Sequence, residues 1–271
     1  MMLRRTFLVY FTAIILIFQA GPLKALEGGL PTSIQKLVGE DALYSVDFLV
    51  FHRVAQAELR FSATDQPGIF RAVLVGRTLG VVSRLSGERT QTYMSLMELS
   101  PDGSLRTIEH TARIVKRRWG RWQDRLRHYR YDYEHGKILD EKTREGVPSK
   151  LKEYDIPEGL HPVDMLTAFY NLRIGVYGSL ERGSRLLIPT YTRGEFTKIE
   201  VRILTHEQQA EQNIFPAQGL LLQVMIDPEI FDTRSGNLYV WFNDAGVPER
   251  GIVEDLIGAG DVIGYLDREG L

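Results

Sequence analysis

The chain has 271 residues, 33 Lys and Arg against 35 Asp and Glu, and no cysteine. Its length allows one large β domain or two small ones, and its ordinary apolar content predicts a packed core. The absence of cysteine excludes disulfides, thiolate metal sites, a cysteine nucleophile and an anchor on an acylated cysteine.

The N-terminus has the pattern of a secretory signal. Arg4 and Arg5 precede an apolar run from Thr6 to Phe18, and the stretch that follows as far as Ala25 contains the small residues Ala20, Gly21 and Ala25. A charged start, an apolar stretch of this length and small residues beyond it are typical of a signal peptide. We therefore expect residues 1–25 to be a signal peptide.

The remainder, residues 26–271, is then expected to be a single exported β-rich domain. The expected location is the periplasm of a Gram-negative bacterium. The alternative is an inner-membrane anchor formed by residues 6–23 that leaves the rest of the chain facing the periplasm, although this run is short for a membrane span.

Strand and turn signals dominate the chain after this segment. Asp65-Gln66-Pro67-Gly68 and Pro101-Asp102-Gly103 have the composition of tight turns between strands. Pro31–Val38 is expected to form a short helix, residues 78–85 are ambiguous, and residues 145–158 are expected to form a loop. Alternating or β-branched runs predict strands at 43–51, 55–62, 69–75, 91–99, 104–116, 122–134, 137–142, 196–204, 219–226, 238–242, 248–256 and 261–266.

Several of these strands are apolar on both faces. In the run 238–242, Leu238, Val240 and Phe242 alternate with Tyr239 and Trp241. A strand with two apolar faces needs cover on both sides of its sheet. The cover could come from a helix, a second sheet, the curvature of the sheet itself or a ligand.

One helix is predicted in the middle of the chain, at residues 162–173. Met165, Phe169 and Leu172 fall on one helical face, and Pro162 suits the first helical position. A lone amphipathic helix among strands must bury this face against a sheet. We therefore predict a mainly β (α+β) fold, in which a strongly curved antiparallel sheet or half-barrel wraps around one central helix.

Asp164 and Arg173 mark the two ends of this helix. They are nine positions apart, so they cannot pair with each other along the helix. We interpret them as charges that the helix dipole favours at each end. The alternative is that each anchors a ligand or a strand residue.

Three segments resemble a known family. Leu43-Tyr44-Ser45-Val46, the helix from Asp164 to Arg173, and the hairpin from Val240 to Arg250 resemble exported bacterial proteins of domain of unknown function 3108, over roughly residues 40 to 267. The resemblance implies no established activity. The family in turn looks like the periplasmic lipoprotein carriers and receptors, in which a curved antiparallel sheet encloses helices and an apolar groove.

The surplus of apolar strand surface predicts a ligand groove between helix and sheet. The candidate groove residues are Met165, Phe169, Leu172, Tyr239 and Trp241. For Trp241, a place in the core is an equal alternative.

A basic stretch from Arg113 to Arg130 holds eight Lys and Arg against one acid. On a strand, Arg125, Arg127, Tyr129 and Tyr131 share a face, which makes them candidates for surface contact with anionic lipid head groups. Export argues against nucleic acid as the partner. The alternative is a solvated face, or one that pairs with the acidic C-terminal third.

Catalytic signatures are absent from the sequence. The six histidines show no metal-ligand spacing, and neither a Gly-x-Ser-x-Gly frame nor a glycine-rich phosphate loop occurs. We therefore expect no catalytic residues, no metal and no cofactor. The leading hypothesis is a non-enzymatic envelope protein that binds a lipid or lipoprotein acyl chain. The alternatives are a structural adaptor in an envelope protein assembly and, less in keeping with the residues, a hydrolase of envelope polymers.

Overall fold

A computed structural model describes residues 34–80, 83, 88–118, 120–225, 236–254 and 261–267. The expected signal peptide and the alternative anchor segment lie outside these residues. The helices are η1 (Ile34–Lys36), α3 (Met165–Arg173) and α4 (His206–Glu211). The strands are β1 (Glu40–Phe48), β2 (Phe51–Ala63), β3 (Ile69–Thr78), β4 (Arg89–Leu99), β5 (Leu105–Arg118), β6 (Arg121–Asp132), β7 (Lys137–Arg144), β8 (Val147–Pro148), β9 (Lys152–Asp155), β10 (Arg185–Thr192), β11 (Glu195–Ile203), β12 (Leu220–Met225), β13 (Asn237–Phe242), β14 (Pro248–Val253) and β15 (Val262–Leu266).

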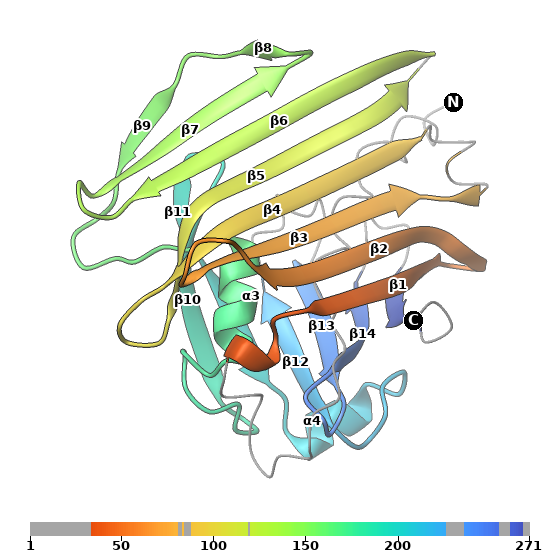
Figure 1. The fold of residues 1–271 in the computed structure, drawn as a ribbon. Helices are drawn as coiled ribbons and strands as arrows, with labels where there is room; N and C mark the ends of the chain where they lie inside the picture. The colour runs from red at the N-terminus through yellow and green to blue at the C-terminus, as the bar shows by residue number, and fades with distance from the viewer. Residues whose placement is uncertain are drawn as a thin grey trace.

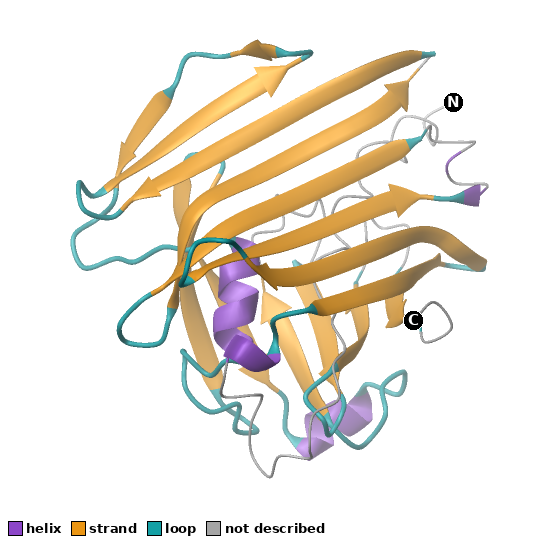
Figure 2. Ribbon diagram, in the orientation of Figure 1, coloured by secondary structure: helices purple, strands orange, loops and turns teal. Residues whose placement is uncertain are grey.

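These strands form one antiparallel sheet with the order β10-β11-β12-β13-β14-β15-β1-β2-β3-β4-β5-β6-β7-β8, and β9 pairs with β7. The pairing of β15 with β1 joins the C-terminal strands to the N-terminal ones. The ends of this path are not paired with each other, so the sheet is rolled but not closed. Figures 1 and 2 show the long strands β2 to β7 curving around α3, with β10 to β14 on the other side of the helix. The predicted curved antiparallel sheet around one central helix is confirmed.

The main core lies between α3 and the concave face of the sheet. Strand alternation supplies this face: Leu59 and Leu74 are directly opposite each other on β2 and β3, and both are buried. The ring of Tyr170 on α3 stacks on Phe61 of β2, with 4.1 Å between their centres. Because α3 is enclosed by the sheet, most of its surface is buried and little of it faces solvent.

A second apolar cluster lies on the opposite face of the C-terminal strands, where Leu204 and Phe215 near α4 pack against β12, β13 and β14. A third lies at the seam of the roll, where Tyr129 and Tyr131 of β6 meet Tyr191 of β10. The backbone N–H of Arg193 donates to the hydroxyl of Tyr129 at 3.1 Å. The two ends of the sheet therefore meet through aromatic side chains and not through a strand ladder.

The structure adds four elements to those predicted. β8 and β9 replace much of the loop expected at 145–158, and α4 and β10 had not been expected. Pro189 interrupts the pattern of β10, but β10 is an edge strand, where proline is tolerated because its missing N–H is not needed by a neighbour. The carbonyl of Pro189 instead accepts the N–H of Val163 at 3.1 Å, just before α3.

Two further predictions concern the N-terminal part of the chain. The short helix expected at Pro31–Val38 is present in part as η1, and the ambiguous stretch 78–85 lies largely outside the described residues.

Candidate functional site: an apolar cavity beside the central helix

Asp164 fixes the N-terminal end of α3. It is the N-cap residue, and its Oδ1 accepts the backbone N–H groups of Leu166 at 2.8 Å and Thr167 at 3.3 Å. This arrangement satisfies two N–H groups that have no partner inside the helix. The helix therefore begins one residue after Asp164, and Pro162 lies before it, not at its first position as predicted.

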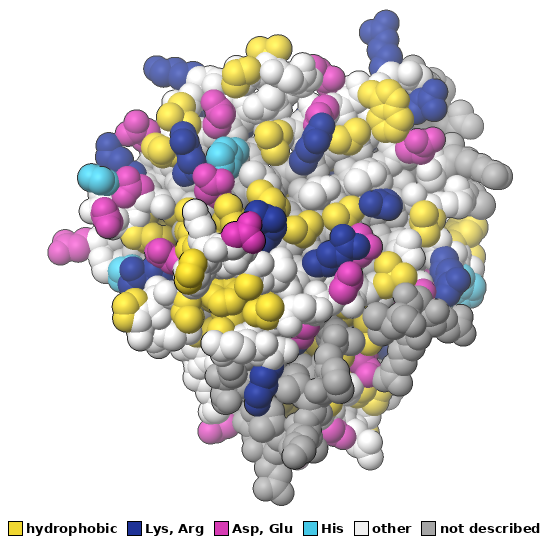
Figure 3. Space-filling view, in the orientation of Figure 1, with side chains coloured by type: hydrophobic (Ala, Val, Ile, Leu, Met, Phe, Trp, Pro, Cys, Tyr) yellow, Lys and Arg dark blue, Asp and Glu magenta, His cyan; other side chains and the backbone are white. Residues whose placement is uncertain are grey.

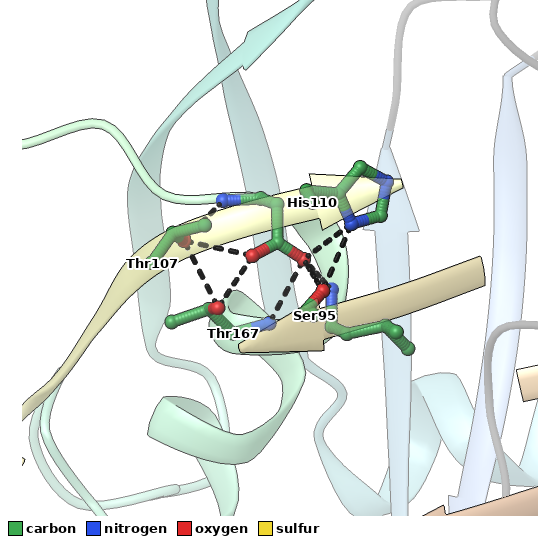
Figure 4. Close-up of polar contacts among 6 residues, drawn as sticks. Ser95, Thr107, His110 and Thr167 are labelled. Atoms are coloured by element: carbon green, nitrogen blue, oxygen red, sulfur yellow. Dashed lines mark hydrogen bonds and ion pairs between the residues drawn. The ribbon is translucent and has the colours of Figure 1, made fainter. Parts of the chain in front are cut away.

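The same carboxylate also ties the helix to the sheet. It accepts hydrogen bonds from the hydroxyls of Ser95 on β4 at 2.6 Å and Thr107 on β5 at 2.7 Å (Figure 4). His110 on β5 lies 3.2 Å from it through Nδ1, an ion pair when the ring is protonated. Every member of this group is buried, so the contacts are shielded from water.

The network holds Asp164 in its charged form. Burial alone raises the pKa of a carboxyl group, but here the charge of His110 and hydrogen bonds from His110, Ser95 and Thr167 outweigh it. The pKa of Asp164 is consequently held well below its ordinary value of 3.8. A carboxylate that is ionised at neutral pH, at the positive end of the helix dipole, is a stabilising arrangement.

Ser95, His110 and Asp164 are the residue types of a nucleophilic triad, but their geometry differs from one. In a triad the carboxylate and the serine contact different nitrogens of the imidazole. Here the Ser95 hydroxyl donates to Asp164 and lies 2.8 Å from Nδ1 of His110, the nitrogen that also faces the carboxylate. Ser95 has no exposed surface. The group is built to hold α3 in place.

Arg173 fixes the other end of α3. Its guanidinium makes two bonds to the carboxylate of Glu40 on β1, at 2.7 and 2.8 Å, and its side chain has no exposed surface. Between the two ends, the side-chain amide of Asn171 makes two hydrogen bonds, each 2.8 Å long, to the backbone of Leu105 at the start of β5. Asp164 and Arg173 thus anchor the helix to strand residues, which was part of the alternative to the dipole interpretation.

All of these anchors run to β1, β4 and β5, on one side of the helix. On the other side, α3 faces β10 to β13 across an apolar cavity of about 60 Å³ that is partly open to solvent. Its wall consists only of apolar side chains: Met165, Ala168, Phe169 and Leu172 from α3, and Ile188, Ile199, Val201, Leu222, Val224, Leu238, Val240 and Phe242 from the strands. An apolar cavity offers water no hydrogen-bond partner, which favours an apolar ligand over water.

The five predicted groove residues divide into two groups. Met165, Phe169 and Leu172 line the cavity. Tyr239 and Trp241 do not, because they alternate with Val240 and point to the opposite face, where they are buried near α4. The indole N–H of Trp241 donates to the carbonyl of Gln218 at 2.7 Å. The prediction was wrong for these two residues, and the alternative of a core tryptophan is correct for Trp241.

The predicted surface contacts are also corrected in part. Arg125 is exposed. Arg127 makes a two-point salt bridge to the buried carboxylate of Asp140, at 3.0 and 2.7 Å. Tyr129 and Tyr131 are buried at the seam, since the face that these four residues share is concave and the β10–β11 edge covers its lower end.

The sequence did not identify the strand residues that form most of the cavity wall. The sequence does carry a pattern that marks them, because every second residue of β11 and β12 is aliphatic. What the sequence did not show is which of two apolar faces a helix would cover. Helix α4 was not predicted, although Thr205 and Gln208 have the spacing of a capping box, which indicates the start of a helix. The two residues form that capping box in the structure.

The described residues contain no group of three or more His, Asp or Glu side chains placed to hold a metal ion. No helix among them is long and apolar enough to span a bilayer.

Comparison with known proteins gives little further guidance. No protein-family model matches the chain, and no curated protein sequence is detectably similar to it. A solved structure of a β-barrel-like protein of domain of unknown function DUF1849 from Brucella abortus is similar at a TM-score of 0.45 and 10% identity, over 85% of this chain and 96% of that one. At this distance the likeness carries no function to the present chain.

Proposed function

We propose that the chain is an exported, non-enzymatic envelope protein that binds the end of an acyl chain in the cavity between α3 and β10 to β13. The observation that carries the proposal is the entirely apolar wall of that cavity, formed by 12 side chains. A site without polar groups cannot orient a polar substrate, but it can bury methylene groups, each contributing about 0.8 kcal/mol.

The size of the cavity limits what it takes in this conformation. A dry cavity of about 150 Å³ binds benzene, whereas this one measures about 60 Å³. It therefore holds a few methylene groups, and a longer chain requires α3 and the C-terminal strands to separate. The anchors at Asp164, Asn171 and Arg173 run to β1, β4 and β5 and would stay intact in such a movement. The backbone hydrogen bond from Val163 to Pro189 of β10 limits the separation at the start of α3.

Membership of the family of domain of unknown function 3108 is part of the same proposal. It rests on the three segments that resemble that family, since no family model matches the chain. Likewise, the periplasmic location rests on the signal-like N-terminus, which is outside the described residues.

The proposal is tested by titrating the protein with cis-parinaric acid, a fatty acid whose fluorescence rises in apolar surroundings. Val240→Phe places a larger ring in the cavity and is expected to abolish the signal. Val75→Phe is the matched control, because Val75 lies on the outward face of β3 and the same volume is added away from the cavity. Equal binding by the two variants, or no binding by the unaltered chain, would reject the cavity as the ligand site.

A further inference from the structure

The antiparallel order of β1 to β8 places alternate turns at opposite ends of the sheet. The β1–β2, β5–β6 and β7–β8 turns lie at one end, toward the top and right of Figure 1. The β2–β3, β4–β5 and β6–β7 turns lie at the other end. We call the first end the basic rim (residues 49–53, 113–117, 120–125 and 144–147) and the second the acidic rim (residues 64–68, 100–104 and 132–136).

Large apolar side chains are exposed at each described turn of the basic rim. The exposed fractions are 58% for Leu49, 80% for Val50 and 45% for Phe51 in the β1–β2 turn. They are 54% for Trp122 beside the β5–β6 turn and 70% for Val147 beside the β7–β8 turn. Single exposed apolar residues need no explanation, but their recurrence at all three of the turns described at this end of the sheet does.

Cations surround two of these turns. Six Lys and Arg lie in residues 113–117, 120–125 and 144–147, against the two acids Asp124 and Glu145. Arg113 pairs with Asp124, and the guanidinium of Arg117 lies 5.9 Å from the ring of Trp122. Arg125 and Arg144 are directly opposite each other on β6 and β7, and both are exposed. Like charges placed opposite one another destabilise a sheet, so the stability of the fold does not explain why arginines occupy these two positions.

The β1–β2 turn contributes apolar surface without net charge. Its Arg53 pairs with Asp267, and its His52 contacts Asp47. Leu49 has a φ of +54°, in a region that glycine, asparagine and aspartate usually occupy in such turns. A leucine at this position, with more than half of its surface exposed, is unfavourable for the turn and points to a contact outside the chain.

The acidic rim has the opposite composition. Its three turns contain Asp65, Asp102, Asp132 and Glu134, with no Lys or Arg. No large apolar side chain is exposed within these turns, and Leu99, directly before one of them, is 37% exposed. In Figure 3, hydrophobic and basic side chains lie along the upper edge and acidic side chains and histidines at the left, with side chains of the opposite charge among each group. The asymmetry therefore follows the two ends of the sheet.

We propose that the basic rim docks on the surface of an anionic phospholipid bilayer. Exposed apolar tips can enter the interfacial region, a tryptophan suits that depth, and flanking Arg side chains attract anionic head groups. This inference is independent of the cavity and its occupant.

The test follows contact between Trp122 and lipid in the full-length chain. Trp119→Phe removes the neighbouring tryptophan, and the buried Trp241 supplies a constant background. Vesicles contain brominated phosphatidylcholine with or without phosphatidylglycerol, because bromine quenches a tryptophan only when it lies close by. Vesicle binding alone would not be diagnostic, since the apolar run near the N-terminus can itself enter a bilayer. We expect quenching of Trp122 with anionic vesicles and little with neutral ones.

Two charge-reversal variants of equal net charge complete the experiment. Arg121→Glu with Arg125→Glu alters the basic rim, and Arg71→Glu with Arg130→Glu alters exposed cations elsewhere. Each cation near an anionic surface contributes roughly fivefold to binding, so the rim variant should need at least about tenfold more lipid for half-quenching. The control should match the unaltered chain.

Three results would overturn the proposal: no quenching with anionic vesicles, equal quenching with neutral vesicles, or an equal loss in the two charge variants. Binding of heparin in place of vesicles would assign the rim to a soluble polyanion. Parinaric acid binding by the rim variant should stay unchanged, so that failure of the rim and failure of the cavity can be told apart.

Discussion

Replacing Asp164 by alanine should destabilise the fold severely. The substitution removes the N-cap, which contributes about 1 kcal/mol. It also removes charge-assisted hydrogen bonds from Ser95 and Thr107, and such bonds contribute about 1.5–3 kcal/mol each when a charged partner is lost. The loss is only partly compensated, because Ser95 keeps its 2.8 Å contact with His110 and Thr107 keeps its 3.0 Å bond to Thr167.

Taken together, these effects predict a loss of about 4 kcal/mol in the free energy of unfolding for Asp164→Ala. Asp164→Asn keeps a capping oxygen but loses the charge, and should lose about half as much. Urea unfolding followed by circular dichroism measures both values. Asp155→Ala, at an exposed position on β9, is the control and should change stability by no more than about 0.5 kcal/mol. A loss below about 1 kcal/mol for Asp164→Ala would refute the view that this carboxylate holds α3 to the sheet.

Three further predictions concern the same helix and its surroundings. Arg173→Met leaves the Glu40 carboxylate buried without its partner and should cost about 3–5 kcal/mol of stability; adding Glu40→Leu should recover much of this, and urea unfolding that shows no recovery would contradict the pairing. Because the pKa of Asp164 is lower in the folded than in the unfolded chain, its contribution is complete above about pH 4 and is lost as the pH falls further; acid titration of stability should therefore be shallower for Asp164→Asn than for the unaltered chain. Trp241→Phe should lower stability, because it removes a buried hydrogen bond, yet leave parinaric acid binding unchanged; a weakened affinity would return Trp241 to the ligand site.

The fold class was predictable because strand alternation and turn composition are local properties. The turns at Asp65–Gly68 and Pro101–Gly103 lie where their glycine and proline content predicted, and the strands on either side are confirmed. Pro189 hid β10, since a proline argues against a strand unless that strand is known to be an edge, and edges are set by the whole sheet.

The site was predictable only on the helix side. Helical spacing identifies Met165, Phe169 and Leu172 as one face whatever lies opposite. On β13 the sequence shows two apolar faces, and only the positions of the two helices decide that Val240 faces α3 and the cavity, whereas Tyr239 and Trp241 pack on the side of α4. The contacts of Asp164 with Ser95 and Thr107 join residues 69 and 57 positions apart, for which no spacing rule exists.

An acyl chain is proposed to enter the hollow between α3 and the C-terminal strands. A crystal of the protein can be grown with a fatty acid brominated near its methyl end and measured at the bromine absorption edge. An anomalous peak is expected among Met165, Phe169, Leu172 and Val240. A hollow without bromine, in a crystal where the fatty acid is bound elsewhere, would contradict this proposal.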